Sequence, residues 1–247
     1  MPTANTTAKP ENGPGAWFAA GVLLADARFP AGGHAHSGGV EPAYTSGAVT
    51  DLASLELFLR GRLRTSGVTA AGLAAAACDP RADWPVLDAE ADARMPSPAQ
   101  RGASRRQGRA LLRAARAAWP EAGHLADLGN ASHHGASHHG VPHHGAYHGA
   151  PHHGAPHHAI VLGAAAAAAG CPRGHAARIA AYQSVSGPAS SAVRLLGLDP
   201  IAVNAIVARI APEIDRIPWE DLPFPSAPNL DILAEVHTTA EVRLFES

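Results

Sequence analysis

The residues best suited to chemistry are histidines, and most of them lie in one stretch. Eleven of the 16 histidines fall between Ser132 and His158, in a repeated unit of Ser/Pro-His-His-Gly-Ala. Neutral imidazoles bind nickel, copper and zinc, so paired histidines on a flexible segment can gather around one ion. The candidate ligands are His133, His134, His138, His139, His143, His144, His148, His152, His153, His157 and His158. A catalytic centre is not expected here, because packed neighbours must hold catalytic geometry to within about half an ångström.

The repeat predicts no regular element of its own. A period of five residues matches neither a helix nor a strand, and the Gly and Pro of the units oppose both. We therefore expect a low-complexity loop, inserted between two helices at about residues 130–158. Two interpretations stay open: a loop that collects metal loosely, nickel above all, or the expansion of a tolerated surface loop whose metal affinity has no role in the cell.

A second set of possible metal ligands lies near the start of the chain, in "FPAGGHAHSGGVEPAY". Pro30 and Gly33 belong to a tight bend, and His34, His36 and Glu41 follow it. A His-x-His pair with a carboxylate could bind a metal and activate water, as in a metal-dependent hydrolase. However, residues two apart on a helix diverge, and no third ligand stands at a fixed spacing. These facts favour the alternative, a helix start with one buried, hydrogen-bonded histidine.

Composition excludes several classes of protein. The formal net charge is −2, so no overall basic field indicates a nucleic-acid partner. Two cysteines, Cys78 and Cys171, fit neither a disulfide framework nor a cysteine-based zinc site. The start of the chain lacks the apolar core of a secretory signal, and no apolar run approaches the roughly 20 residues that a bilayer crossing needs. We expect a soluble, cytoplasmic protein without a membrane partner.

The elements that would position these residues are predicted to be helices. The chain is 46% hydrophobic but only 5% aromatic, and much of the apolar content is alanine, which suits closely packed helices. Near residues 50–63, four leucines recur at helical spacing, while Arg60, Arg62 and Arg64 can point outward. We therefore predict an all-α, single-domain helical bundle over residues 16–247, preceded by a disordered tail at residues 1–15.

Two of the predicted helices have clear beginnings. Ser97 can cap a helix that starts at Pro98, and Gln100 completes a capping box. Asp199 caps a helix that starts at Pro200. A further helix is expected over residues 174–186.

The helix that follows Ser97 is rich in arginine. Arg101, Arg105, Arg109 and Arg113 are spaced by four residues, with Arg106 and Arg116 to one side. Such a stripe could pair with carboxylates of a partner protein or could simply be a solvated face. Gly108 costs about 0.5–1 kcal/mol relative to alanine inside a helix, so it suggests the close approach of another backbone, internal or foreign.

The C-terminal segment from Ser226 onward combines Pro228 with an apolar set that ends in Leu244 and Phe245. An apolar terminus of this kind either folds back on its own domain or becomes ordered against a partner. We find no phosphate-binding Gly-x-x-x-x-Gly-Lys-Ser/Thr loop and no nucleophile with its base in the sequence.

Five segments, in order, resemble the urease accessory protein UreF family. They are "LLADARFPAGGHAHSGGVE", "RQGR" at residues 106–109, "HHAIVLGAAAAAAG", "RLLGL" at residues 194–198, and "SAPNLDILAEVHTTAEVRLF" at the C-terminus. One departure is His34, where the family commonly has an aromatic residue. The histidine stretch lies outside the family pattern.

The resemblance implies an all-α homodimer that is not an enzyme. Such proteins join UreD (also called UreH) and the GTPase UreG to deliver nickel to apo-urease, and the C-terminal tail would dock on UreD. It implies partner-binding roles for Pro30, Gly33, His36, Ser37, Glu41, Arg105, Arg106, Gln107, Arg109, Arg194, Asp231, His237, Arg243, Leu244 and Phe245. No intrinsic cofactor is expected beyond possible nickel on the histidine loop, and a nickel-storage protein remains an alternative.

Overall fold

The computed structural model describes residues 17–31, 33, 36–134, 155–240 and 244–245, without the side chains of residues 130–134. Regular structure within these ranges is helical and includes no strand, although His36 forms an isolated backbone bridge. The elements in chain order are α1 (Phe18–Ala25), α2 (Val40–Thr45), α3 (Leu52–Arg62), the π-helical turn η2 (Leu63–Gly67), α4 (Val68–Ala77), α5 (Trp84–Ala93), α6 (Pro98–Ala118), α7 (Gly123–His134), α8 (His158–Ala168), α9 (Arg173–Leu196), α10 (Pro200–Asp215) and α11 (Pro228–Thr238). The all-α class is confirmed. The division into a tail and one domain stays a prediction.

Three helices rich in small residues form the centre of the molecule. Helix α4 packs against both α8 and α9. A Cβ atom on Gly163 of α8 would lie 2.2 Å from the carbonyl oxygen of Ala74 in α4, so these two helices meet in direct backbone contact. Small side chains allow helix axes to approach this closely. The alanine-rich composition therefore serves a tightly packed helical centre.

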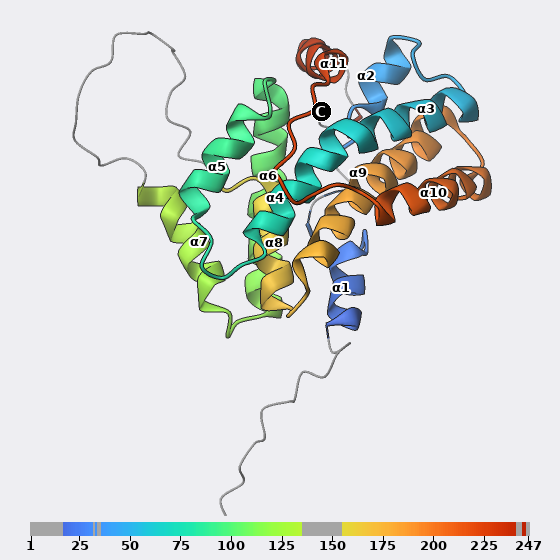
Figure 1. The fold of residues 1–247 in the computed structure, drawn as a ribbon. Coiled ribbons are helices and arrows are strands. Elements are labelled where there is room, and N and C mark those ends of the chain that lie inside the picture. Colours follow the sequence, from blue (N-terminus) through green and yellow to red (C-terminus); the bar gives the residue numbers. More distant parts are fainter. Residues whose placement is uncertain (1–16, 32, 34–35, 135–154, 241–243, 246–247) are drawn as a thin grey trace, which may run out of the picture.

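Two apolar cores flank this centre. On one side α5, α6 and α7 enclose buried residues such as Leu111, Leu125 and Leu128. On the other side α2, α3 and α10 enclose buried residues that include Leu55 and Ile206. Figure 1 shows these two groups of helices on opposite sides of α4, α8 and α9.

The predicted helix beginnings are confirmed with one correction. The Asp199 carboxylate accepts from the amides of Ile201 and Ala202 at the start of α10. Ser97 accepts from the amide of Gln100 at 3.2 Å. The Gln100 side chain does not complete the box, because its amide donates to the carbonyl oxygen of Leu230 in α11 instead. A tertiary contact has replaced the local one. Helix α9 also runs ten residues beyond the expected end at residue 186.

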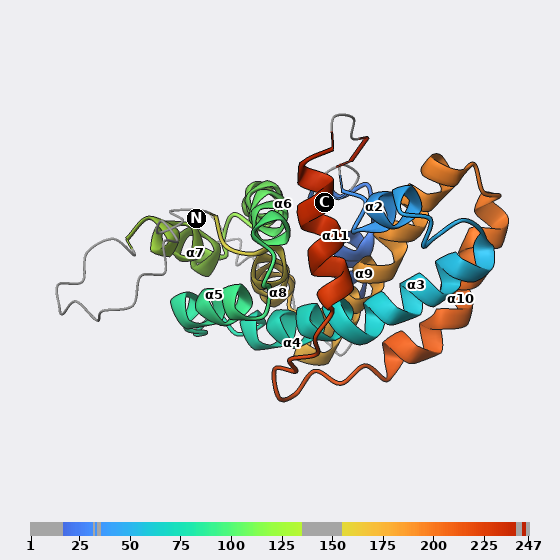
Figure 2. The ribbon, with the colours of Figure 1, turned by 90° about the horizontal axis from the view of Figure 1, so that it is seen from above.

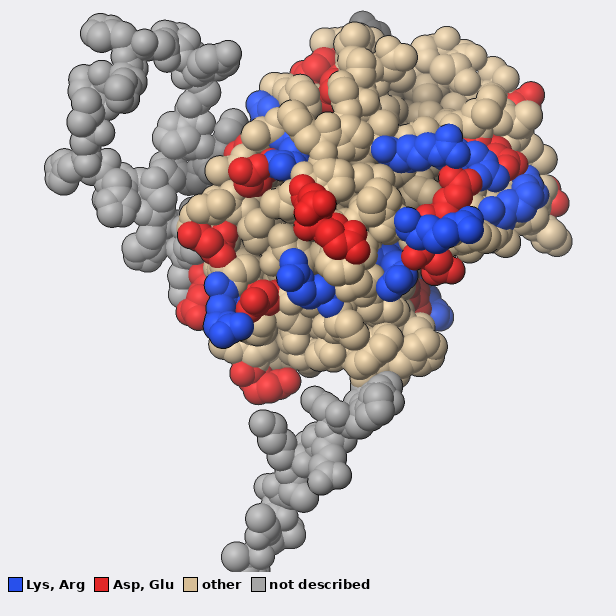
Figure 3. Space-filling view, in the orientation of Figure 1, with Lys and Arg blue, Asp and Glu red and all other residues tan. Residues whose placement is uncertain are grey.

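A network of ion pairs joins α3 to α10 on the surface. Glu56 contacts Arg60 at 2.7 Å and Arg209 at 2.5 Å, and Glu213 contacts Arg60 and Arg64. Figure 3 shows blue and red side chains alternating on the side of the molecule where α3 and α10 lie. Two of the three arginines expected to point outward therefore do so, in pairs that neutralise the charge. The third, Arg62, points inward.

The C-terminal helix α11 lies across the molecule, where it contacts α6 and α2 (Figure 2). Beyond it, Leu244 and Phe245 return to α2. Of the two fates expected for the apolar terminus, the described residues show folding back on the chain's own domain. No helix among the described residues is both long and apolar enough to cross a bilayer.

Candidate functional site

Residues from opposite ends of the chain meet around Glu41. The Glu41 carboxylate is buried at the start of α2 and accepts hydrogen bonds from the backbone amides of Leu244, at 2.7 Å, and Phe245, at 2.8 Å. The Nε2 atom of His237, at the end of α11, lies 3.2 Å from the same carboxylate. Amide donors of this kind satisfy a buried carboxylate. Glu41 thereby anchors the C-terminus.

Helix α9 supplies the third side of this cluster. The guanidinium carbon of Arg194 lies 4.6 Å from the ring centroid of Phe245, a cation–π contact. The Ser191 hydroxyl donates to the carbonyl oxygen of His36 at 3.3 Å. Arg194 and Leu244 are themselves exposed. We call Glu41, Arg194, His237, Leu244 and Phe245 the tail cluster; it is a buried anchor with an exposed rim.

Other residues with a predicted partner role lie before α2, in the bend after α1 and on α11. His36 and Ser37 are buried immediately before α2, whereas Pro30 and Gly33 are exposed in the bend after α1. Asp231 is half-buried on α11. The structure thus brings the tail cluster together with the His36 and Ser37 segment before α2 and, among the described residues, no more of the set. His34 and Arg243 lie outside the described residues.

The hydrolase interpretation of His36 and Glu41 finds no support in this geometry. Both carboxylate oxygens of Glu41 accept backbone amides, so the carboxylate is not left to activate a water molecule. The favoured alternative, a helix start with a buried histidine, agrees with the burial of His36.

The arginine-rich helix α6 does not present a uniform docking stripe. Arg105 is buried, and its Nη2 atom lies 2.8 Å from both Asp88 and Asp92 of α5. Its guanidinium is thus engaged inside the fold, and its partner-binding role stays a prediction. Arg106 and Arg109 are exposed, and Gln107 lines an internal cavity.

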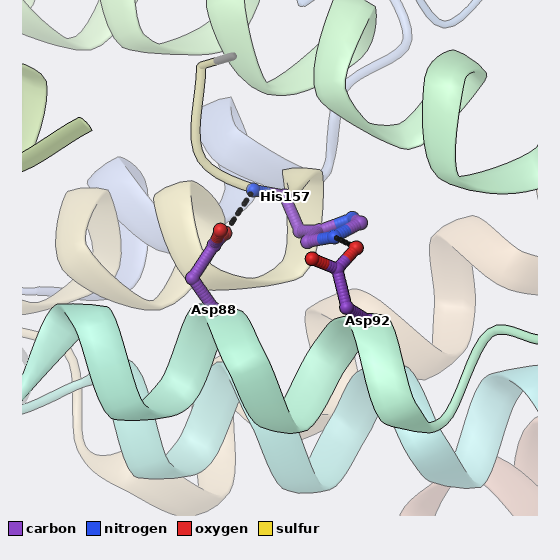
Figure 4. Close-up of side chains that lie close together, drawn as sticks. All are labelled: Asp88, Asp92 and His157. Carbon is purple, nitrogen blue, oxygen red and sulfur yellow. Dashed lines mark hydrogen bonds and ion pairs between the residues drawn. The ribbon is translucent and has the colours of Figure 1, made fainter. Parts of the chain in front are cut away.

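Arg105 belongs to a polar network that holds the segment before α8. Figure 4 shows Asp88 and Asp92 projecting from one face of α5 toward His157. His157 is fully buried; its Nε2 lies 3.0 Å from Asp92, and its backbone amide donates to Asp88 at 3.2 Å. Because an ionised carboxylate only accepts, Nε2 carries the proton of this bond. Ser104 of α6 completes the network at 3.0 Å from Nδ1 of His157.

Gly108 makes room for the same segment. A Cβ atom on Gly108 would lie 1.9 Å from the carbonyl oxygen of Pro156. The close approach of another backbone, suggested by this glycine, is confirmed, and that backbone is internal. Arg105 adds a hydrogen bond to the carbonyl oxygen of Ala155 at 3.0 Å. Residues 155–158 are therefore a fixed part of the fold.

The network resembles a metal site but is already occupied by a cation. The ligand atoms of Asp88, Asp92 and His157 lie within 4.8 Å of one another, a spacing that an ion could use. However, the guanidinium of Arg105 contacts both carboxylates and would repel a second positive charge. Burial by itself would raise the pKa of Asp92, but the hydrogen bond from His157 and the charge of Arg105 outweigh it and lower that pKa. We interpret this group as a structural network that holds the segment before α8 in place.

The histidine stretch divides between described and undescribed residues. His133 and His134 belong to α7, and their side chains are outside the described part. His157 and His158 lie inside the domain, which corrects their placement in a loose loop. The other seven, His138, His139, His143, His144, His148, His152 and His153, lie outside the described residues.

Sequence reasoning missed two features. Asp88 and Asp92 are four residues apart, so one face of a helix presents both, and this spacing was the available signal. Arg62 follows Leu59 by three residues and Leu55 by seven, which places it on the buried face of α3. Its Nε atom donates to the carbonyl oxygen of Ser184 at 3.0 Å.

Together, these observations define an all-helical protein whose C-terminal residues are anchored on Glu41 near its N-terminus. Comparison with known proteins gives the family. The model of the family described as UreF matches residues 49–211. The urease accessory protein UreF of Mycolicibacterium vanbaalenii is 41% identical over 232 residues, which cover 92% of this chain and 97% of the relative. The proteins of the same name from Mycobacterium marinum and Mycobacterium tuberculosis are 40% and 38% identical over 229 residues, again covering 92% of this chain and 97% of each relative.

The chain belongs to the UreF family of urease accessory proteins. It is therefore an accessory protein and not an enzyme.

Proposed function

We propose that this chain is a cytoplasmic adaptor for urease maturation. In this proposal it assembles with UreD (or UreH) and the GTPase UreG, and the assembly inserts nickel into apo-urease at the expense of GTP. The observation that carries the proposal is the tail cluster, in which segments shared with the UreF family meet from both ends of the chain. GTP chemistry would belong to UreG, because the sequence has no nucleotide-binding glycine loop.

The tail cluster and α11 form the surface proposed to bind UreD. Ile232 and Val236 of α11 and Leu244 beyond it are all 60% exposed or more, and Arg194 adds a positive charge. Exposed apolar side chains rimmed by polar ones are typical of protein-binding surfaces. Because Glu41 already holds the tail in place, the partner would meet a preformed surface and lose less affinity to ordering the chain.

A matched pair of substitutions tests this surface. Leu244 and Leu57 of α3 are equally exposed, at 74% and 73%, but only Leu244 belongs to the tail cluster. Leu244→Asp should weaken UreD binding at least about tenfold, because burying an unpaired charge costs more than 1.4 kcal/mol. Leu57→Asp should bind as the parent does. Affinity for immobilised UreD measures both, and equal affinities of the two variants would contradict the docking surface.

Assembly with UreG requires a separate measurement. Co-purification of the chain with UreD, UreG and apo-urease, followed by urease activity with and without GTP, tests the adaptor role. A chain that failed to retain UreG in the presence of UreD would overturn the proposal.

We propose further that the protein is a homodimer. Phe18 and Val22, four residues apart on α1, are 61% and 53% exposed and form an apolar stripe on that helix. Light scattering should give twice the chain mass for the parent protein and the single mass for Phe18→Asp. A parent protein of single mass would contradict the dimer.

For the histidines we propose loose nickel collection in service of delivery. Seven of them lie within residues 135–154, apart from His157, which is held by its contact with Asp92. Deleting residues 135–154 should lower the nickel bound per chain in equilibrium dialysis and slow urease activation when nickel is scarce. If nickel binding falls but activation does not, the stretch stores metal or has no role. Parallel dialysis with copper and zinc measures its preference, since imidazoles accept all three ions.

A further inference from the structure

A cavity of about 490 Å³ lies between the central helices and the C-terminal segment. Arg62 from the end of α3, Ser184 of α9 and His158 of α8 line it, and Asp231 of α11 lies on its other side. Apolar atoms form most of its surface, although many of the lining residues are polar or charged. A largely apolar cavity with convergent polar groups is the usual form of a small-molecule site.

Arg62 is a cation without a counterion in this cavity. Its Nε atom donates to the carbonyl oxygen of Ser184, but no carboxylate of the described residues forms an ion pair with Arg62. Its two terminal nitrogens donate to no described protein group. Burial lowers the pKa of Arg62 to about 10, so the side chain is still charged at neutral pH. The side chain is partly exposed and its terminal nitrogens are not among the buried polar atoms, so an anion in the cavity can reach them.

The glycine turn before α2 brings the guanidinium into place. Gly38 has a φ of +59°, and a Cβ atom there would lie 3.3 Å from both the guanidinium carbon and a terminal nitrogen of Arg62. The absence of a side chain at position 38 therefore leaves room for the guanidinium, and its Nε hydrogen bond to Ser184 limits its orientation.

Several other charged groups of the cavity have an ion-pair partner or a shifted pKa. Asp26 pairs with Arg28 at 2.7 Å, and Arg94 pairs with Glu90. Burial, with the charge of Glu235, raises the pKa of Asp231. Burial and the nearby His36 lower the pKa of His158 to about 4, so that imidazole is neutral near pH 7.

One buried acceptor also lacks a donor. Gln183, next to Ser184 on α9, lines the cavity, but its Oε1 atom is buried and receives no hydrogen bond from the described residues. Its amide nitrogen donates to the carbonyl oxygen of Leu24 at 2.8 Å, which fixes the orientation of the group. Because the Oε1 atom has almost no exposed surface, Arg62 alone selects the ligand, which must carry a negative charge.

We propose that this cavity binds a small, free, planar oxyanion of the carboxylate or hydrogencarbonate class on the terminal nitrogens of Arg62. A guanidinium presents two parallel N–H donors that match the two oxygens of such an anion. Arg194 of the tail cluster also lines the cavity, so the site adjoins that cluster, but the proposal does not depend on the adaptor role.

The test uses the full chain and two arginine variants. Unfolding temperature is followed against sodium hydrogencarbonate and against sodium acetate, at fixed pH, with sodium chloride at equal ionic strength as the reference. Arg62→Met removes the cavity charge at similar volume. Arg64→Met is the matched control, because Arg64 is 70% exposed and pairs with Glu213 on the surface. We expect saturable stabilisation of the parent and of Arg64→Met, and at least a tenfold weaker effect in Arg62→Met.

A second measurement does not depend on how Arg62→Met folds. The ¹³C signal of labelled hydrogencarbonate should broaden in the presence of the parent protein, and added acetate should reverse the broadening. Arg62→Lys keeps the charge but loses the paired donors, so it should bind more weakly than the parent. Stabilisation of the parent no greater than with chloride, or undiminished binding in folded Arg62→Met, would overturn the proposal.

Discussion

Replacing Gly108 with alanine probes how the segment before α8 is fixed. Gly108 and Gly102 both lie inside α6, so alanine at either position should gain about 1 kcal/mol in helix propensity. Their surroundings differ. The new Cβ at position 102 would meet only the terminal Nη1 of Arg106, at 3.2 Å, and a flexible side chain can move away. The new Cβ at position 108 would lie 1.9 Å from the Pro156 carbonyl oxygen.

The size of the effect follows from that contact. Real Cβ atoms keep at least about 3.0 Å from such atoms, so the Pro156 carbonyl would have to shift by about 1.1 Å. Overpacking of this kind costs about 1–3 kcal/mol, and loss of the hydrogen bond from Arg105 to Ala155 would add about 1 kcal/mol. After the propensity gain, Gly108→Ala should destabilise by about 2 kcal/mol, while Gly102→Ala should stabilise by up to about 1 kcal/mol.

Calorimetry on the full-length variants measures the difference. A gap of about 3 kcal/mol corresponds to roughly 6–12 °C in Tm for a chain of this size. Gly102→Ala is the control for helix propensity, since only the neighbour of the new methyl group differs. Equal shifts in the two variants would refute the contact between Gly108 and Pro156.

Three further predictions concern the same region. Deleting residues 135–154 should leave Tm within a few degrees of the parent, whereas a deletion that also removes Ala155 and Pro156 should lower Tm clearly, because Arg105 loses its carbonyl acceptor. Similar Tm values for the two deletions would show that Ala155 and Pro156 do not contribute to stability. Asp92→Asn should lower the free energy of unfolding at pH 7 by about 1–3 kcal/mol, measured by urea titration. The difference in stability between variant and parent should disappear as the pH falls below 3.8, because the pKa of Asp92 is lowered in the folded chain and the parent loses this stabilisation when Asp92 is protonated. The pKa of His158 is lowered from 6.5 to about 4 in the folded chain, so the unfolded chain takes up the proton first, and the parent should lose up to about 2 kcal/mol of folding stability through this residue between pH 7 and pH 5. His158→Gln should lose correspondingly less stability over this range, and identical profiles of stability against pH would contradict the burial of this imidazole.

Much of the fold could be predicted from the sequence because its signals are local. Ser97 and Asp199 mark helix beginnings through side chains that reach amides two or three residues away. Gly108 indicated a close backbone contact through its position inside a helix. What a local pattern does not contain is the partner of the contact, and Pro156 lies 48 residues further along the chain.

The residues of the site could be grouped from the sequence, but their contacts with one another could not. Glu41, His237 and the last residues were grouped through the family resemblance, but their mutual contacts depend on how α11 crosses the molecule. His157 was assigned to the repeat because its sequence is that of the repeat. Its burial depends on Asp92 and Ser104, which come from helices far away in the sequence. Composition does not distinguish a histidine that belongs to a core from its neighbours in a low-complexity stretch.

The central packing of α4 against α8 and α9 joins residues from before and after the histidine stretch. A fragment ending at residue 134 would contain α4 without its two companions, and a fragment beginning at residue 155 would contain those companions without α4. Neither fragment has a complete interior, so each must find the other before it can fold. A single proteolytic cut between residues 134 and 155 should accordingly leave two fragments that stay associated, because the packing of α4 against α8 and α9 holds them together.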